Sequence, residues 1–347
     1  MKELRNLTSQ AELKKRLQTD TERRKTVSFY QYYPIENPQE FRDKFYENLE
    51  NLGVLGRIYI AAEGINAQIS VPEKNFQKFK KYLDSINFLK NIRLNIAVED
   101  DGKSFWVLNV KVRKKIVADG IEDETFSMER KGAYVDAEEF NELTENPDTI
   151  VVDMRNYYEY EVGHFENALE VSSDTFREQL PMAAAMLADK KDQNIIMYCT
   201  GGIRCEKASA YLLHNGFTKV FHLEGGIIEY VHKVKEKGLE NKFKGKNFVF
   251  DSRLGEQISN EIISNCHQCG EKSDTHRNCE NTACHLLFIQ CERCFEKMNG
   301  CCGEECFEFI KLPLEKQKEV RRNQNKQESK SFNNSQNRLR ARFFDVR

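Results

Sequence analysis

Residues 194–207 read NIIMYCTGGIRCEK, and this stretch decides the fold of the central part of the chain. The apolar run Asn194–Tyr198 is typical of a buried strand, and Glu206–Leu213 is typical of a helix that stops at Gly216. A short loop with two glycines joins them. A strand, a short loop and a helix in this order turn backbone N–H groups toward one point, so the stretch predicts an α/β unit with an anion-stabilising loop.

A cysteine opens this loop and an arginine closes it. Cys199 follows the strand directly, and Arg204 stands five positions later at the start of the helix. Loop N–H groups, the helix N-terminus and a guanidinium all stabilise a thiolate. We therefore expect a lowered pKa for Cys199, which makes it a nucleophile at neutral pH. The alternative is a buried structural cysteine before an ordinary turn.

Four motifs in chain order resemble those of rhodanese-type domains. They are TIVVDMRN at 149–156, Glu159 with GHFENA at 163–168, the loop at 199–204, and VFHLEGG at 220–226. The resemblance implies a rhodanese-like doubly wound parallel sheet over residues 133–240. The six-residue loop is similar to that of the sulfurtransferase branch, because the related phosphatases have a longer one.

The same resemblance implies the roles of the loop residues. Cys199 and Arg204 are the expected catalytic residues. Thr200, Gly201, Gly202 and Ile203 are expected to form an anion cradle, and Arg155 to brace the loop electrostatically.

The region before this domain alternates strands and helices in another order. Strands are expected at 26–33, 57–61, 66–71 and 94–98, and helices at 38–52 and 73–85. This βαββαβ order over residues 26–98 predicts an α+β, ferredoxin-like domain. Residues 1–25 read as a basic helix. Residues 99–132 read as a connector with strand-like pieces at 105–107 and 110–112 and a basic run at 111–115.

Composition limits the class of protein. The 347 residues carry a net charge of −2 and are 39% hydrophobic, without an apolar run that could span a membrane or open a signal peptide. The cytoplasm is the expected compartment, and thiols stay reduced there. The tail at 313–347 is basic and poor in apolar residues, so we expect it to be disordered. Its charge favours either a polyanionic partner or a merely solvated tail.

Nine of the eleven cysteines lie after residue 265, in a cysteine-rich segment at 241–312. Eight of them fall into four pairs, with Cys301 left over, and joining alternate pairs predicts two cross-braced four-cysteine sites. The first set is Cys266, Cys269, Cys291 and Cys294; the second possible set is Cys279, Cys284, Cys302 and Cys306. Structural zinc suits such ligands. A metal-free thiol cluster and disulfides formed after purification are the alternatives.

The arrangement of the whole chain resembles the bacterial tRNA uridine 5-hydroxylases, rhodanese-like proteins that convert uridine 34 to 5-hydroxyuridine with molecular oxygen. Three segments carry the resemblance: RIYIAAEGINAQ at 57–68, CTGGIRCEK at 199–207, and the stretch 278–291. It implies oxygen as a co-substrate, no organic cofactor, and the tRNA anticodon loop as partner, with neither DNA nor a membrane. Neither the tRNAs chosen nor the oligomeric state follows from these residues.

Three functions fit the loop chemistry. In the first, the Cys199 thiolate adds to C6 of uracil and makes C5 electron-rich enough to react with oxygen. In the second, Cys199 carries a persulfide and the protein is a sulfurtransferase, with Cys205 as a conceivable resolving thiol. In the third, the protein binds tRNA without catalysis. The intact Cys199 and Arg204 favour an enzyme.

Overall fold

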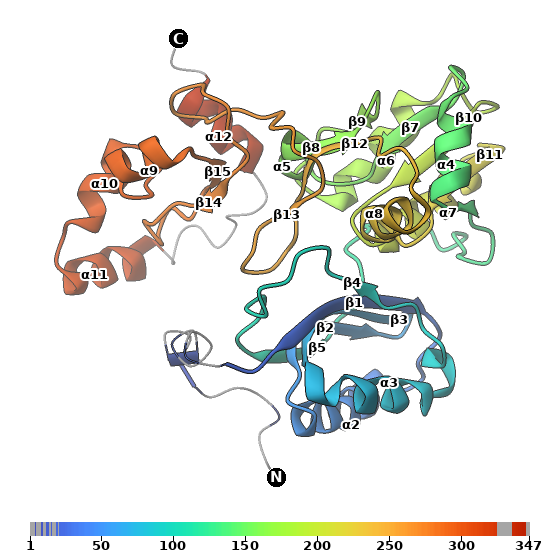
Figure 1. Ribbon diagram of the computed structural model, residues 1–347, viewed down its shortest axis with the longest axis horizontal. Coiled ribbons are helices and arrows are strands. Elements are labelled where there is room, and N and C mark those ends of the chain that lie inside the picture. The colour runs from blue at the N-terminus through green and yellow to red at the C-terminus, as the bar shows by residue number, and fades with distance from the viewer. Residues whose placement is uncertain are drawn as a thin grey trace.

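The computed structural model describes residues 21–324 and 335–344, together with positions 4, 8, 9, 12, 13, 15 and 19. The basic helix expected over residues 1–25 therefore lies largely outside the described residues. Figure 1 shows an N-terminal sheet domain, a central sheet domain and a C-terminal segment that packs beside the central one. Within the described part of the chain, no helix combines the length and the hydropathy needed to cross a bilayer.

The N-terminal domain is a five-stranded sheet in the order β4-β1-β3-β2-β5. Its elements are β1 (Arg24–Tyr32), α2 (Pro38–Asn51), β2 (Leu55–Ala61), β3 (Gly64–Pro72), α3 (Phe76–Asp84), β4 (Asn95–Ile96) and β5 (Leu108–Val112). Helices α2 and α3 cover one face, where Phe45, Leu49 and Phe79 are buried against the strands. The expected α+β architecture is confirmed.

Strand β5 was expected only as a strand-like piece of the connector. It pairs in parallel with β2, so the sheet continues past residue 98. Its side chains alternate, because Leu108 and Val110 are buried while Lys111 is exposed. That period of two matches the pleat of a strand with one face on a core. A further difference is that α3 begins at Phe76, after a 3₁₀ turn at Glu73–Asn75.

The central domain is a parallel sheet in the order β6-β11-β10-β7-β9. The strands are β6 (Ala133–Val135), β7 (Ile150–Asp153), β9 (Leu169–Glu170), β10 (Asn194–Tyr198) and β11 (Lys219–Leu223). The helices are α4 (Ala137–Thr144), α5 (Tyr157–Val162), α6 (Phe176–Met186), α7 (Ile203–His214) and α8 (Gly226–Lys237). Separate cores lie beneath α6 with α7 and beneath α4 with α8, which confirms the doubly wound sheet.

The C-terminal segment is tied to both preceding domains. Strand β8 (Gly163–Phe165) of the central domain pairs with β12 (Phe243–Asn247), which pairs with β13 (Glu256–Gln257). Around β13, the Glu256 carboxylate accepts a hydrogen bond from Val98 N, and Ser252 Oγ donates to Ser104 O. Residues 251–257 thus connect the N-terminal domain to the rest of the chain. The remaining elements are β14 (His276–Asn278), β15 (Leu287–Ile289), α9 (Glu292–Met298) and α10 (Glu304–Ile310).

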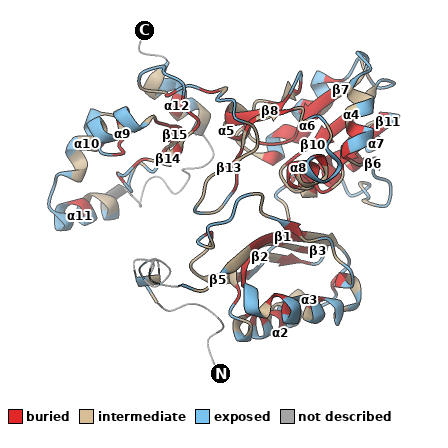
Figure 2. Cartoon of the chain, viewed as in Figure 1, coloured by how far each residue is buried: buried red, intermediate tan, exposed pale blue. Residues whose placement is uncertain are grey.

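The expectation that the tail at 313–347 is disordered is wrong for the residues described there, which form α11 (Leu314–Gln324) and α12 (Ser335–Phe343). Leu339 is only 4% exposed, and Phe343 stacks on Phe288 with a centroid separation of 5.8 Å. These two apolar residues are four apart, so they share one face of α12. Figure 2 shows α12 lying against the cysteine-rich segment. Two well-placed side chains thus dock a helix whose average composition is polar.

Candidate active site

The central strand β10 ends at the carboxyl edge of its sheet, and Cys199 follows it there. Helix α7 begins four residues later, after Gly202, which has a left-handed φ of 99°. The Gly202 N–H donates to Cys199 Sγ at 3.2 Å. Cys199 is only 1% exposed, yet it borders a cavity of about 970 Å³ between the N-terminal and central domains. The thiol therefore borders a cavity that is itself partly open to solvent.

The start of α8 holds the loop in this shape. Ile227 N donates to Cys199 O at 3.0 Å, and Ile228 N donates to Thr200 O at 3.2 Å. Gly226 makes this approach possible, because a Cβ there would lie 2.4 Å from the Cys199 carbonyl oxygen. These two bonds fix the backbone at the start of the loop, and the N–H groups of Gly202 and Cys205 farther along it are the ones that point at the thiol. This close packing explains why the motif VFHLEGG ends in glycine at position 226.

The surroundings of Cys199 favour its thiolate. Burial by itself raises the pKa of the thiol, but the Cys205 thiol, the Arg204 charge and the N–H groups of Cys205 and Gly202 outweigh burial and lower the pKa to about 6. Burial and the neighbouring thiolate raise the pKa of Cys205 well above its ordinary value, so Cys205 stays protonated and donates. Cys205 thus supports the nucleophile directly.

Arg204 acts on the thiolate by its charge, while its hydrogen bonds go elsewhere. Its guanidinium binds both carboxylate oxygens of Glu159, at 2.7 and 2.8 Å, and approaches Thr200 Oγ1 at 3.4 Å. Glu159 is fully buried, and an unpaired charge there would be costly. The sequence motif contained Glu159 without assigning it a role. The sequence signal for a role is that Glu159 stands three residues after Asn156. In the structure its carboxylate accepts a hydrogen bond from the Asn156 backbone N–H at 3.0 Å.

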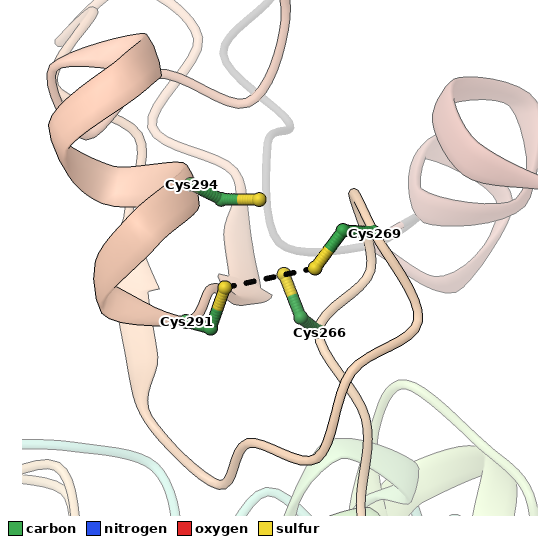
Figure 3. A group of neighbouring side chains, drawn as sticks. All are labelled: Cys266, Cys269, Cys291 and Cys294. Carbon is green, nitrogen blue, oxygen red and sulfur yellow. Dashed lines mark hydrogen bonds between the residues drawn. The ribbon is translucent and has the colours of Figure 1, made fainter.

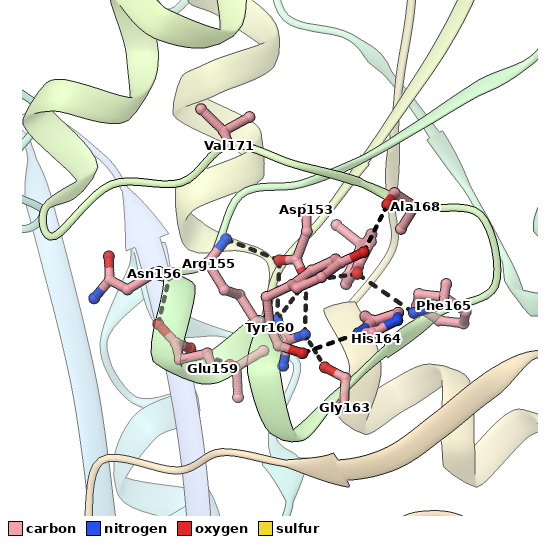
Figure 4. Close-up of polar contacts among 12 residues, drawn as sticks. Asp153, Arg155, Asn156, Glu159, Tyr160, Gly163, His164, Phe165, Ala168 and Val171 are labelled. Carbon is pink, nitrogen blue, oxygen red and sulfur yellow. Dashed lines mark hydrogen bonds and ion pairs between the residues drawn. The ribbon is translucent and has the colours of Figure 1, made fainter. Parts of the chain in front are cut away.

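Arg155 makes its side-chain hydrogen bonds outside the loop, and its expected electrostatic role at the loop stays a prediction. Its side chain binds Asp153 at 2.6 Å and Gly163 O at 2.5 Å, and Tyr198 Oη donates to the same Asp153 carboxylate at 2.5 Å (Figure 4). Within the described residues, no hydrogen bond joins the Arg155 side chain to residues 199–204. Because Arg155 and Asp153 are both fully buried, each neutralises the other inside the core.

The N-terminal domain also donates hydrogen bonds to the loop, which the sequence did not reveal. Asn95 Nδ2 donates to Gly201 O at 3.1 Å, and Tyr32 Oη donates to Ile203 O at 3.2 Å. Just after the loop, Glu206 accepts a hydrogen bond from Tyr30 Oη at 2.9 Å. The loop is thus held between two domains.

Lys207 adds ion pairs to these contacts between the domains. It is only 2% exposed and pairs with Glu63 at 2.7 Å and with Asp119 at 3.2 Å. Its ammonium also lies 4.9 Å from the centroid of the Tyr32 ring. A lysine on the first turns of a helix usually suggests a solvated side chain, whereas this one joins the helix after the loop to the N-terminal domain and the connector.

Eight of the nine C-terminal cysteines gather in the two groups that their spacing suggested. Cys266, Cys269, Cys291 and Cys294 form one group, drawn in Figure 3. Cys279, Cys284, Cys302 and Cys306 form the other, and within each group the sulfur atoms lie within 4.8 Å of one another. Cys301 stands outside both groups. His267 belongs to neither group either, because its ring pairs with Glu161 at 2.7 Å.

The sulfur separations fit a tetrahedral metal ion. Individual pairs are 3.6 Å apart for Cys269 with Cys291, 3.7 Å for Cys284 with Cys302, and 3.8 Å for Cys302 with Cys306. A Zn–S bond of about 2.3 Å in a tetrahedral site puts its sulfurs about 3.8 Å apart. All eleven cysteines are free thiols. The donor sets are therefore suited to zinc.

Known families match most of the chain. Residues 24–116 match the UPF0176 acylphosphatase like domain, residues 136–233 the rhodanese-like domain and residues 244–307 the rhodanase C-terminal domain. The tRNA uridine(34) hydroxylase of Photorhabdus laumondii is 59% identical over 97% of this chain and 96% of its own length. The chain belongs to the tRNA uridine(34) hydroxylase family. Members from Pectobacterium carotovorum and Yersinia enterocolitica are 61% and 58% identical, over 92% and 97% of this chain and 90% and 97% of their own.

The electrostatics of the loop predict a pH profile for the thiol. Because the pKa of Cys199 is about 6, alkylation by iodoacetamide should rise through pH 6 and level off above it, where the thiolate predominates. Cys205→Ala removes a donor and should slow alkylation at pH 6 by roughly three- to tenfold. Cys205→Ser keeps an O–H donor and is the control. A midpoint near the ordinary value of a free cysteine in the unchanged protein would contradict this description.

Proposed function

We propose that this protein hydroxylates uridine 34 of tRNA at C5, with Cys199 as the nucleophile and molecular oxygen as co-substrate. The observation that carries the proposal is a buried thiol whose pKa is lowered to about 6 at the wall of a 970 Å³ cavity. The family to which the chain belongs is named for the hydroxylation of uridine 34 in tRNA. An anticodon-loop base is already single-stranded, so extruding it into such a cavity costs little.

The first step is covalent. The Cys199 thiolate adds to C6 of the uracil ring, the new S–C bond saturates C6, and the electron pair of the C5–C6 double bond moves to C5 and the O4 carbonyl as an enolate. Such addition converts an unreactive base into a carbon nucleophile. The loop N–H groups and Arg204 hold the thiolate before the addition and receive it again when it leaves.

The second step places oxygen on C5. The enolate carbon reacts with molecular oxygen and a proton to give a C5 hydroperoxide. Two equivalents of an external thiol reduce it to the C5 alcohol, with one disulfide and one water as products. Loss of the C5 proton then expels Cys199, which restores the double bond and the thiolate. The balance is one uridine, one oxygen molecule and two thiols giving one 5-hydroxyuridine, one water and one disulfide.

Mass spectrometry of nucleosides tests this function. Unmodified tRNA incubated with the protein, air and a thiol should gain one oxygen on a uridine. Cys199→Ala should reduce the product by at least about a hundredfold, since covalent activation is lost, while Cys301→Ala should keep wild-type activity because Cys301 lies outside the site. Product should also disappear without oxygen. A Cys199→Ala variant with full activity contradicts the mechanism.

The same assay separates hydroxylation from sulfur transfer. A persulfide on Cys199 would suit the same array of N–H groups, so the loop geometry alone fits both chemistries. A sulfurtransferase acting on the base replaces an oxygen atom by sulfur, whereas the hydroxylase adds an oxygen atom. Product with sulfur, together with a persulfide detected on Cys199, would replace the present proposal by the sulfurtransferase.

We also propose that each four-cysteine group binds a structural zinc ion. The support is the separation of the sulfurs, which suits tetrahedral zinc, and the buried position of most of these side chains. Zinc bound to thiolates stabilises small domains that lack a large apolar core. Here it would join β14, β15, α9 and α10 into one unit beside α12.

Elemental analysis of protein purified with a reductant and without a chelator should find two zinc ions per chain, one for each group of cysteines. Cys294→Ser and Cys306→Ser should each lose one zinc ion and lower the melting temperature, because binding energy becomes folding energy. Cys301→Ala is the matched control and should keep both ions. Fewer than about one zinc ion per chain in the unchanged protein would refute the proposal.

A further inference from the structure

The N-terminal sheet has one face that α2 and α3 leave free. Figure 1 shows this sheet between its own helices and the central domain. Residues of β1, β2, β3 and β4 on the free face border the cavity that contains Cys199. The active-site chamber therefore has a second wall, and neither the loop chemistry nor the rhodanese-like fold accounts for it.

Strand register arranges the side chains of this face in two rows. The first row, from β1 across to β5, is Tyr30, Asn66, Tyr59 and Lys111. The second, from β4 across to β5, is Asn95, Ser28, Gln68, Arg57 and Asn109. Neither row contains an aliphatic residue. A face built to pack on another protein layer would be apolar, whereas this one carries aromatic rings, amides and cations.

Some of these groups already have structural partners. Tyr30 and Asn95 bind Glu206 and Gly201 of the central domain. Tyr59 and Gln68 make no such contact with the loop, and both line the chamber. The Gln68 amide nitrogen donates to Asn66 Oδ1 at 2.6 Å, which orients the two amides toward each other. An oriented pair of amides beside an aromatic ring is suited to reading the edge of a nucleobase.

One cation of the connector lies over this ring. The guanidinium of Arg113 lies 5.5 Å from the centroid of the Tyr59 ring, and Arg113 and Lys114 are exposed at the same chamber. Arginine over an aromatic ring together with a neighbouring lysine suits a base and its phosphate. The basic run of the connector is thus placed beside the aromatic platform.

Phe250 is a second aromatic residue of the chamber. Phe250 is 43% exposed, which is unusual for a phenylalanine beside a buried site, and it lines the same cavity. Its backbone oxygen accepts from Arg57 Nη2 at 3.1 Å, and the Arg204 guanidinium lies 5.9 Å from its ring centroid. The half-buried Tyr59 and the exposed Phe250 therefore both line the cavity that Cys199 borders.

We propose that the free face of the N-terminal sheet is the recognition surface for the single-stranded nucleotides that flank the uridine held at Cys199. One base stacks on Tyr59 in the place that the Arg113 guanidinium occupies in this structure, with its polar edge toward Gln68, while Arg113 turns with Lys114 to the phosphates. A duplex does not fit, because its bases are not free to stack on side chains. This inference rests on the proposed function, since it takes the anticodon loop as the occupant of the chamber.

The Kd of a fluorescently labelled RNA stem-loop that carries uridine at the position of tRNA nucleotide 34 tests this surface. The measurement does not require turnover. Tyr59→Leu keeps an apolar side chain but removes the ring, and should raise the Kd about five- to hundredfold, the range for one lost stacking contact. Tyr59→Phe keeps the ring and should stay within about twofold of wild type. Arg113→Ala should weaken binding and lower the slope of log K against log salt by about 0.7.

Alkylation of Cys199 at pH 6 checks that each variant retains its loop, and the exposed Arg113 gives a second test should Tyr59→Leu fail to fold. An unchanged Kd in Arg113→Ala and in a folded Tyr59→Leu overturns the inference, as does equal competition by a duplex of the same length. If the wild type binds the stem-loop through Tyr59 but forms no 5-hydroxyuridine, the proposed reaction fails and the surface stands. If hydroxylation proceeds and Tyr59→Leu has an unchanged KM, only the surface fails.

Discussion

Two backbone N–H groups at the start of α8 bind the carbonyl oxygens of Cys199 and Thr200, and the active-site loop depends on this contact. These bonds fix the backbone at the start of the loop, and the N–H groups of Gly202 and Cys205 farther along it donate to the thiolate. The contact requires glycine at position 226. The buried sulfur has a lowered pKa because Cys205, Arg204 and those N–H groups outweigh its burial.

Each of the three buried basic residues around the loop is paired with one or two carboxylates. Arg155 is neutralised by Asp153 in the core, while Arg204 is held by Glu159 at the edge of the chamber. Farther out, Lys207 is shared between Glu63 of the N-terminal domain and Asp119 of the connector. The thiolate is thus placed at a junction between domains. Because the domains meet through paired charges, their approach and the electrostatics of the site depend on each other.

Local features of the site could be predicted from the sequence, and long-range ones could not. The strand before Cys199, the glycine loop and the helix after it follow from residues that are neighbours in the chain. The preference of Arg204 for Glu159, forty-five positions away, depends on how α5 packs against α7. Likewise, β5 was recognisable as strand-like, but its pairing with β2 depends on tertiary contacts that the local sequence does not specify. The helix α12 was missed because Leu339 and Phe343 are too few to show a period.

The contacts of residues 251–257 with residues 98–104 bear on the order in which the molecule assembles during synthesis. Every strand of the N-terminal sheet has emerged by residue 112, and every strand of the central sheet by residue 223, so both can form early on the ribosome. The bonds of Glu256 and Ser252 to the N-terminal domain come only afterwards. Phe250 and Arg253 of the chamber wall arrive with them. A nascent chain therefore carries its nucleophile before the wall of its substrate cavity is complete.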